Sequence, residues 1–343
     1  MTVTFDNGGT LAERFRAHMG HSPTLYGHAM RGMADDWEAG GVVREICRDW
    51  ESAPAGAVVQ LRLLAGVFRL VLRGEAPRLE PYYACLGGQA APEGVWPVMR
   101  EVMAAHVPEL SAGLAVPPQT NEVGRSSALL VGLFEAVRRS GLTSVRLLEP
   151  GASAGLNLLV DDFRFENRGW THGPAGSPLV LRDGIHGDLV PQELSIVERR
   201  GCDLEPVDAT TEEGRLHLTS FVWPFHVERH ERLRAALAIA ATHPVTVDRA
   251  HAAEWVEAQL AHAPADGVLT VVWQSITRMY WPAEETARVE RAVEQARARM
   301  PLAHVAMEYG PGGGREGAEL TLDGEVLAHV GDHGTPVTLV PRA

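Results

Sequence analysis

The stretch Ser144–Phe163, with the sequence SVRLLEPGASAGLNLLVDDF, decides the fold of this chain. Val145–Leu148 is a short apolar run, as expected of a strand that is buried on both faces of a sheet. Glu149 ends this run, and small residues then alternate with others up to Gly155. The apolar residues from Leu156 onward predict a helix. A strand, a glycine-rich turn and a helix in this order predict the ligand-binding corner of a doubly wound α/β domain.

The chain around this stretch shows two different patterns. Residues 1–141 are expected to be almost entirely helical, with Val58–Leu72 as a buried central helix because it is apolar nearly all round. From residue 142 to residue 343, strands and helices alternate, which predicts a parallel sheet with a turn-rich insertion near 164–190. Asp323-Gly324 between two alternating runs predicts an antiparallel hairpin at the end of the sheet. We therefore predict a helical N-terminal or lid domain followed by a Rossmann-like α/β domain.

The charge balance limits the partners of the protein. The chain of 343 residues carries a formal net charge of −13, whereas nucleic acids are bound mainly through clustered Lys and Arg. We therefore expect a small-molecule substrate and no nucleic acid. The sequence does not indicate an oligomeric state.

Other features of the sequence predict a reduced cytoplasmic protein. No window approaches the ~18 uninterrupted apolar residues of a membrane span, so we expect no membrane association. The N-terminal segment MTVTFDNGGTLAERF lacks the basic start and the apolar core of a signal peptide. Three cysteines, Cys47, Cys85 and Cys202, are scattered and show no metal-binding spacing.

The glycine-rich turn does not match the common phosphate-binding patterns. No lysine lies near Gly155, which excludes a GxxxxGK[ST] loop. The dinucleotide pattern GxGxxG fails because Ser153 and Leu156 stand where glycines are required. An acidic residue followed by alternating small residues suits a ligand that is held by backbone contacts without a pyrophosphate.

Several segments resemble known families. LLEPGASAGLNLL resembles the first motif of class I S-adenosylmethionine-dependent methyltransferases, an acidic-x-Gly-x-Gly-x-Gly turn, and the closing hairpin is similar to that fold too. GCDLEP resembles the end of its second strand, HAAEW the segment that flanks the adenine, and VVWQSITRMYWP its fourth strand. The whole chain also resembles an uncharacterised bacterial family, a domain of unknown function, in QTNEVGRSSALL, LLEPGASAGLNLL, RRGCDLEPVD, VWPFHVERHERLRAALAIA and DHGTPV.

The resemblance implies S-adenosylmethionine as the cofactor and methylation of a small molecule. Asp203 would accept hydrogen bonds from the ribose hydroxyls if the insertion leaves the sheet; otherwise Asp183 would take this role. Ser153 replaces the middle glycine, which requires a negative φ at that position. The implied cofactor-binding residues are Glu149, Gly151, Ser153, Ala154, Gly155, Asn157, Asp203, Ala252, Trp273 and Gln274.

Polar residues around this corner are expected on the acceptor side. The segment QTNEVGR gathers four polar groups after Pro117-Pro118, although Thr120 or Asn121 could instead cap the next helix. The candidate substrate-binding residues are Gln119, Asn121, Arg125 and Ser275, and the candidates for a general base are Glu122, His226 and His251.

The spacing of His226 and His230 can hold zinc on a helix. No third ligand stands out, and Glu228 is off that face. We therefore expect a solvated helix surface and no metal.

Two other functions are compatible with the sequence. Gly151, Ser153 and Gly155 also satisfy GxSxG, the nucleophile elbow of α/β hydrolases, with Ser153 as the nucleophile. Alternatively, the protein is a non-catalytic ligand-binding protein on a methyltransferase-like fold. The hydrolase would need an acid–histidine pair drawn from Asp248 or Asp323 and His329 or His333.

Overall fold

The computed structural model describes residues 9–310 and 317–341 of the chain. Residues 1–8, the start of the N-terminal segment MTVTFDNGGTLAERF that is predicted not to be a signal peptide, lie outside this range. The described chain divides into a sheet unit, Asn121–Glu212 with Glu231–Ala343, and a helical unit, Val3–Thr120 with Glu213–His230. The division falls at residue 120 and not at 141, because the helix that precedes the first strand packs on the sheet.

The helical unit is built around α4, Val59–Leu72, which is buried as the sequence predicts. The stretch Ala55–Leu72 is long and apolar enough to cross a membrane, but 67% of it is buried inside the protein, as in a core helix. The other helices of this unit are α1 (Leu11–Met19), α2 (Leu25–Glu38), α3 (Val42–Ile46), α5 (Val95–Ala105), α6 (Val107–Gly113) and most of α8 (Glu212–Ser220).

The sheet unit is a mixed α/β structure. Its described residues form a nine-stranded, mostly parallel sheet in the order β5-β12-β11-β10-β9-β8-β1-β6-β7. Strand β1, Ser144–Pro150, pairs in parallel with β6 on one side and with β8 on the other, which confirms the predicted buried strand. The remaining strands are β5 (Ile185–His186), β6 (Ser195–Asp203), β7 (Val247–Arg249), β8 (Val268–Ser275), β9 (Leu302–Tyr309), β10 (Ala318–Leu322), β11 (Glu325–Val330) and β12 (Val337–Leu339).

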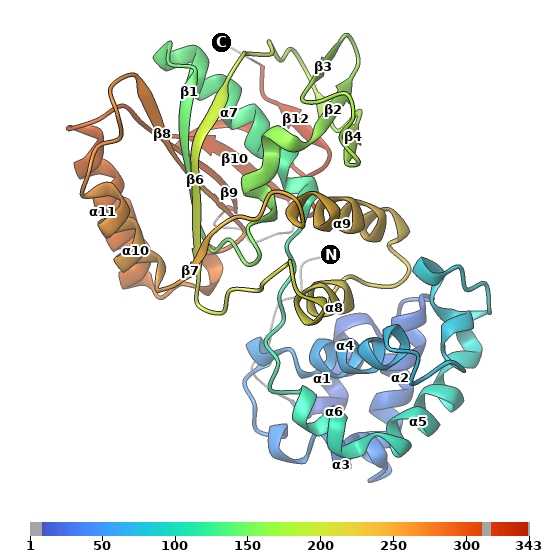
Figure 1. Ribbon diagram of the computed structural model, residues 1–343. Helices are drawn as coiled ribbons and strands as arrows, with labels where there is room; N and C mark the ends of the chain where they lie inside the picture. The colour runs from blue at the N-terminus through green and yellow to red at the C-terminus, as the bar shows by residue number, and fades with distance from the viewer. Residues whose placement is uncertain (1–8, 311–316, 342–343) are drawn as a thin grey trace. The chain divides into compact units, whose positions relative to one another are not determined.

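Helices cover both faces of this sheet (Figure 1). Helix α7, Ser126–Ser140, packs on β8, β9 and β10, and α10 (Ala252–Leu260) and α11 (Ala283–Arg297) pack on the opposite face. Gly132 of α7 comes so close to β9 that a Cβ atom there would lie 2.3 Å from Val305 Cγ1. Helix α9, Val227–Ala240, begins in the helical unit and ends in the sheet unit.

The hairpin and the insertion both form as predicted. Strands β10 and β11 are antiparallel and are joined at Asp323-Gly324. Most of the insertion forms a separate three-stranded sheet, and its short strand β5 joins the far edge of the main sheet beside β12, so Asp203, and not Asp183, ends the strand beside β1. The strands of the small sheet are β2 (Arg164–Asn167), β3 (Trp170–His172) and β4 (Val180–Arg182).

The α-helix predicted after the glycine-rich turn is wrong. Leu156–Asp162 forms a short 3-10 helix, with non-helical angles at Leu159, and the chain then enters β2. Asn121 Oδ1 accepts the Leu156 N–H group at 2.8 Å, which satisfies one of the free donors at the start of this helix. A ligand at this corner therefore has no α-helix dipole to bind against.

Candidate functional site

The strand order reverses at β1, where β6 and β8 lie on opposite sides. Ligands of open α/β sheets bind outside the carboxyl ends of the strands at such a switch point. Glu149 lies near the end of β1, Asp203 ends β6 and Ser275 ends β8. The structure thus brings together two strand-end residues that were predicted to bind the cofactor, Glu149 and Asp203, and one that was predicted to bind the substrate, Ser275. With Arg125 and Glu308, we call them the carboxyl-edge cluster.

The glycine-rich turn is left-handed at alternate residues. Gly151, Ser153 and Gly155 have φ angles of 79°, 56° and 72°. The expectation of a negative φ at Ser153 is wrong, because its N–H group donates to Asp203 Oδ2 at 2.9 Å and this holds the turn. Asp203 Oδ1 also accepts the Glu205 N–H group at 3.0 Å, so Asp203 braces two turns and does not cap a helix.

The left-handed backbone at Ser153 predicts a stability difference between two variants. Ser153→Ala and Ser153→Gly both remove the hydroxyl group, but only glycine adopts a positive φ without steric cost. We expect the glycine variant to be more stable than the alanine variant by about 1 kcal/mol. Urea unfolding of the two variants measures this difference, and equal midpoints would show that Ser153 is not left-handed in solution.

The protein itself occupies the space beside the glycines of the turn. A Cβ atom at Gly151 would lie 2.3 Å from Thr277 Oγ1, and one at Gly155 would lie 2.6 Å from Val245 Cγ2. Both glycines are therefore required by packing as well as by their φ angles. A ligand that contacts Gly151 has to displace Thr277.

Glu149 is a buried carboxyl group with an unsatisfied oxygen atom. Its side chain is 2% exposed, and burial raises its pKa to about 8, opposed by the nearby groups of Trp273, Arg125 and Asn157. Neither Glu149 Oε2 nor the buried Trp273 Nε1 on the neighbouring strand makes a well-aligned hydrogen bond, although the Trp273 indole is close enough to favour the charged form of Glu149. Poorly satisfied buried polar atoms are rare in folded proteins, so this pair is a candidate ligand site.

Arg125 lies among several acidic groups of the cluster. Its Nη1 donates to the Ser275 carbonyl oxygen at 3.0 Å, while its buried Nε has no partner. Burial lowers the pKa of Arg125, and the nearby Glu122 and Glu308 favour its charged form. Glu122 in turn accepts the Gly124 N–H group at 3.1 Å and lies 3.5 Å from Arg232 Nη2. The general-base candidate Glu122 therefore lies at the cluster, but its carboxylate is already paired with Arg232.

A buried polar chain that the sequence analysis missed links β8 to β9. Gln274 Nε2 donates to Glu308 Oε1 at 3.0 Å, and the same oxygen accepts the N–H groups of Thr277 and Arg278, each at 3.2 Å. His304 Nε2 therefore donates to Gln274 Oε1 at 3.0 Å, and burial lowers the pKa of this histidine to about 4. Burial also raises the pKa of Glu308. An acid at the end of a buried strand, as at Glu149, was the signal that could have found Glu308.

Three of the segments on which the resemblance rests, QTNEVGRSSALL, LLEPGASAGLNLL and DHGTPV, contact one another at this edge. Asn121 binds the backbone of Leu156, and Ser126 Oγ donates to Asn157 Oδ1 at 2.8 Å. A Cβ atom at Gly334 would lie 2.1 Å from the Arg125 nitrogen, so the DHGTPV loop packs directly on the QTNEVGR segment. The expectation that Thr120 or Asn121 caps the following α-helix is wrong, because Glu122 caps a short 3-10 helix instead.

The histidine candidates do not join the cluster. His226 and His230 lie in the helical unit, where His226 packs against the rings of Trp223 and Phe225. His230 is 5% exposed and its Nε2 lies 3.2 Å from the Trp223 carbonyl oxygen, so the predicted solvated helix surface is wrong.

The remaining candidates are not among the residues that define the cluster. Gln119 belongs to the helical unit, two residues before Asn121. His251 follows β7 as the N-cap of α10, with a mostly exposed side chain 3.8 Å from Glu285, and Ala252 is buried at the start of that helix. Ala154 is buried within the turn.

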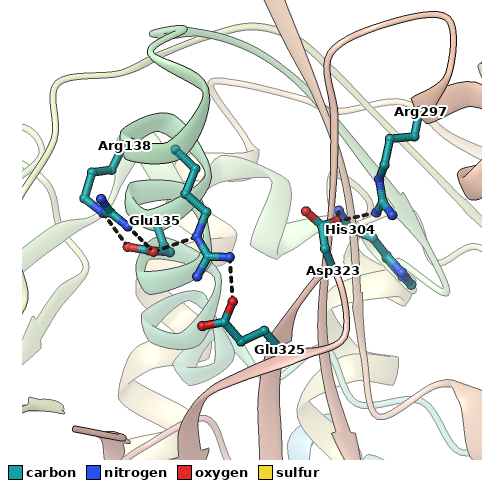
Figure 2. Close-up of polar contacts among 7 residues, drawn as sticks. Glu135, Arg138, Arg297, His304, Asp323 and Glu325 are labelled. Carbon is teal, nitrogen blue, oxygen red and sulfur yellow. Dashed lines mark hydrogen bonds and ion pairs between the residues drawn. The ribbon is translucent and has the colours of Figure 1, made fainter. Parts of the chain in front are cut away.

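The acid–histidine pair of a hydrolase is not assembled in the described chain. Asp323 lies at the opposite edge of the sheet, where it binds Arg297 and the His304 N–H group (Figure 2). Asp248 binds Arg200 and the Trp255 indole. Neither carboxylate bonds to a histidine side chain among the described residues.

Two hollows on the described surface lie away from the cluster. One, of about 580 Å³, lies in the helical unit and is lined by Arg44, Arg48 and Arg100 together with Glu45 and Glu51. The other, of about 290 Å³, lies beside the last turn of α7 at the amino edge of the sheet. Both hollows mix basic and acidic side chains, with three arginines and two glutamates in the first and Arg139, Arg297 and Asp323 in the second.

One set of described residues has ligand atoms close enough to hold a metal ion. Glu75, His106 and Glu109 bring such atoms within 4.8 Å of one another in the helical unit. Glu109 already pairs with Arg73 at 3.1 Å, and Glu75 is exposed. Ion pairing at the surface therefore explains why these three side chains lie close together.

The fold and the cluster define a mixed α/β protein with a group of buried polar residues at the carboxyl edge of a mostly parallel sheet. The chain belongs to the family described as "Uncharacterized protein conserved in bacteria" (DUF2332), whose model matches residues 11–338. Comparisons with curated proteins and with solved structures found no match. The family description carries no activity, so function has to be argued from the site.

Proposed function

We propose that this protein is an S-adenosylmethionine-dependent methyltransferase that acts on a small molecule. The observation that carries the proposal is the set of buried, unsatisfied polar atoms at the switch point. This set holds one acidic acceptor, Glu149 Oε2, and two donors, Arg125 Nε and Trp273 Nε1. The amino-acid end of S-adenosylmethionine has complementary charges, because its ammonium group would bind the acceptor and its carboxylate would bind the donors.

The neighbouring strand supplies a second acid at a suitable place for the ribose. Asp203 ends β6 beside β1, its carboxylate accepts the N–H groups of Ser153 and Glu205, and it is the acid that would meet the ribose hydroxyl groups. When bound, the sulfonium of the cofactor supplies an already activated methyl group. The chain would hold the cofactor, align the nucleophile of the acceptor with the methyl group and exclude water.

Isothermal titration with S-adenosylmethionine tests this proposal. We expect binding to the wild type and a loss of about tenfold or more in Asp203→Ala, because hydrogen bonds to ribose hydroxyls disappear. Asp183→Ala is the matched control, since Asp183 follows β4 in the separate small sheet and should leave binding unchanged. No heat of binding at ~1 mM cofactor would overturn the proposal.

One observation supports a hydrolase as the second candidate. Ser153 has a left-handed φ in a tight turn after a strand, and strain at this place is typical of a nucleophile elbow. A fluorophosphonate probe that labels the wild type and not Ser153→Ala would favour the hydrolase. Cofactor binding without turnover over a broad acceptor panel would instead favour a non-catalytic ligand-binding protein. A cytoplasmic location and the absence of nucleic-acid or membrane partners remain predictions.

A further inference from the structure

The segment Ile276–Trp281 runs directly over the glycine-rich turn. Thr277 Oγ1 and Thr277 Cβ lie 2.3 Å and 2.9 Å from the position that a Cβ atom of Gly151 would take. This contact is close only because Gly151 has no side chain. Thr277 therefore covers the part of the turn that a ligand at the switch point would contact.

The same segment begins at a strained residue. Ile276 follows the last residue of β8 and has a φ of 48°, although a β-branched residue in this region is a conformational outlier. Such strain persists only where surrounding contacts hold it, and it concentrates in switch regions. Ile276 is held by the hydrogen bond from its N–H group to the Met307 carbonyl oxygen, at 2.8 Å.

A single carboxylate oxygen fixes the next two residues. Glu308 Oε1 accepts the N–H groups of Thr277 and Arg278, and Gln274 holds the carboxylate in place. The next two residues are exposed to solvent: Met279 is 54% exposed and Tyr280 is 74% exposed. The segment is therefore attached at both ends, to Glu308 at Thr277 and Arg278 and to the core at Trp281, with the 3-10 helix Arg278–Tyr280 between them.

We infer that Ile276–Trp281 is a lid, latched by Glu308, that covers the turn at Gly151 and has to open before a ligand can reach it. Strain at Ile276 favours opening, and the hydrogen bonds to Glu308 oppose it. That the ligand is S-adenosylmethionine rests on the proposed function. The latched lid itself does not depend on the identity of the ligand.

Hydrogen exchange of the full-length protein tests the latch without any ligand. Glu308→Ala removes the acceptor of both N–H groups, so we expect the amides of Thr277 and Arg278 to exchange about tenfold faster, the effect of losing about 1.4 kcal/mol of protection. Glu290→Gln is the matched control, because Glu290 lies only 3.9 Å from Arg278 but contacts its exposed side chain and not the lid backbone. Unchanged exchange in Glu308→Ala, with the rest of β8 still protected, would overturn the latch.

A second variant keeps the test decisive if Glu308→Ala does not fold. Thr277→Ala removes Oγ1 from above Gly151 and should increase the association rate of S-adenosylmethionine by about threefold or more, because less contact has to be broken. If the cofactor binds the wild type and Thr277→Ala at the same rate, the lid is wrong. If the cofactor binds neither protein while exchange responds to Glu308→Ala, the proposed function fails and the lid stands.

Discussion

Replacing Glu149 by glutamine is expected to remove a large part of the pH dependence of stability. Burial raises the pKa of this carboxyl group from 4.5 to about 8 in the folded protein. The folded state therefore binds the proton more tightly than the unfolded state does. The free energy of unfolding that this group contributes is fully present below pH 4.5 and is lost as the pH rises toward 8. The full loss is on the order of 5 kcal/mol, and an uncharged glutamine of the same shape avoids it.

Urea unfolding between pH 5 and pH 9, ~4 units that span this window, measures the effect. Glu149→Gln should match the wild type at the acidic end and become progressively more stable than it as the pH rises. Glu198→Gln is the control, because Glu198 lies on the neighbouring strand β6 but is half exposed and pairs with Arg146. If the wild type and Glu149→Gln lose stability in parallel over this range, Glu149 is ionised and satisfied in the folded protein.

The sequence predicted the strand ends better than the turns between them. Glu149 was placed correctly because a buried apolar run followed by an acid identifies the end of a parallel strand, whereas Asp203 was offered, with Asp183 as the alternative, on the resemblance of GCDLEP. The same pattern occurs where Glu308 follows the apolar residues of β9, and it was read only as a strand. The local sequence was therefore sufficient to identify Glu308 as a strand-end acid, as it was for Glu149.

The backbone of the turn could not be predicted, because distant residues determine it. The positive φ of Ser153 is held by a carboxylate fifty positions along the chain, at Asp203. The 3-10 helix at Leu156 begins on the side chain of Asn121, which the sequence placed at the cap of another helix. Neither contact has a local signal, so propensity favoured an ordinary glycine turn followed by an α-helix.

Contacts between segments far apart in sequence could not be predicted either. The DHGTPV loop and the QTNEVGR segment meet where Gly334 packs on Arg125 and Gly124 packs on the carbonyl oxygen of His333. The resemblance to the bacterial family included both segments but did not indicate that they touch. The arginine that lies among the acids of the cluster is held at this junction.

Replacing Gly151 by alanine is expected to destabilise the protein by about 3 kcal/mol, because two costs add. The left-handed φ of 79° disfavours any side chain, and the new Cβ atom would meet Thr277 Oγ1 at 2.3 Å. Gly141→Ala separates the two costs, since Gly141 has a φ of 71° but no atom within 4 Å of its Cβ position. This control should lose only about 1 kcal/mol.

Urea unfolding separates the steric cost of Gly151→Ala from its conformational cost. The four proteins compared are the wild type, Gly151→Ala, Gly141→Ala, and Gly151→Ala combined with Thr277→Ala. Removing Thr277 Oγ1 should recover part of the cost of Gly151→Ala, because the closest contact is lost while the Cβ atom of residue 277 still lies 2.9 Å from the new Cβ atom. An equal cost for Gly151→Ala and Gly141→Ala would mean that Thr277 does not rest on the turn in solution. The turn would then be open to ligands without a lid, and the exposed residues Met279 and Tyr280 would need another explanation.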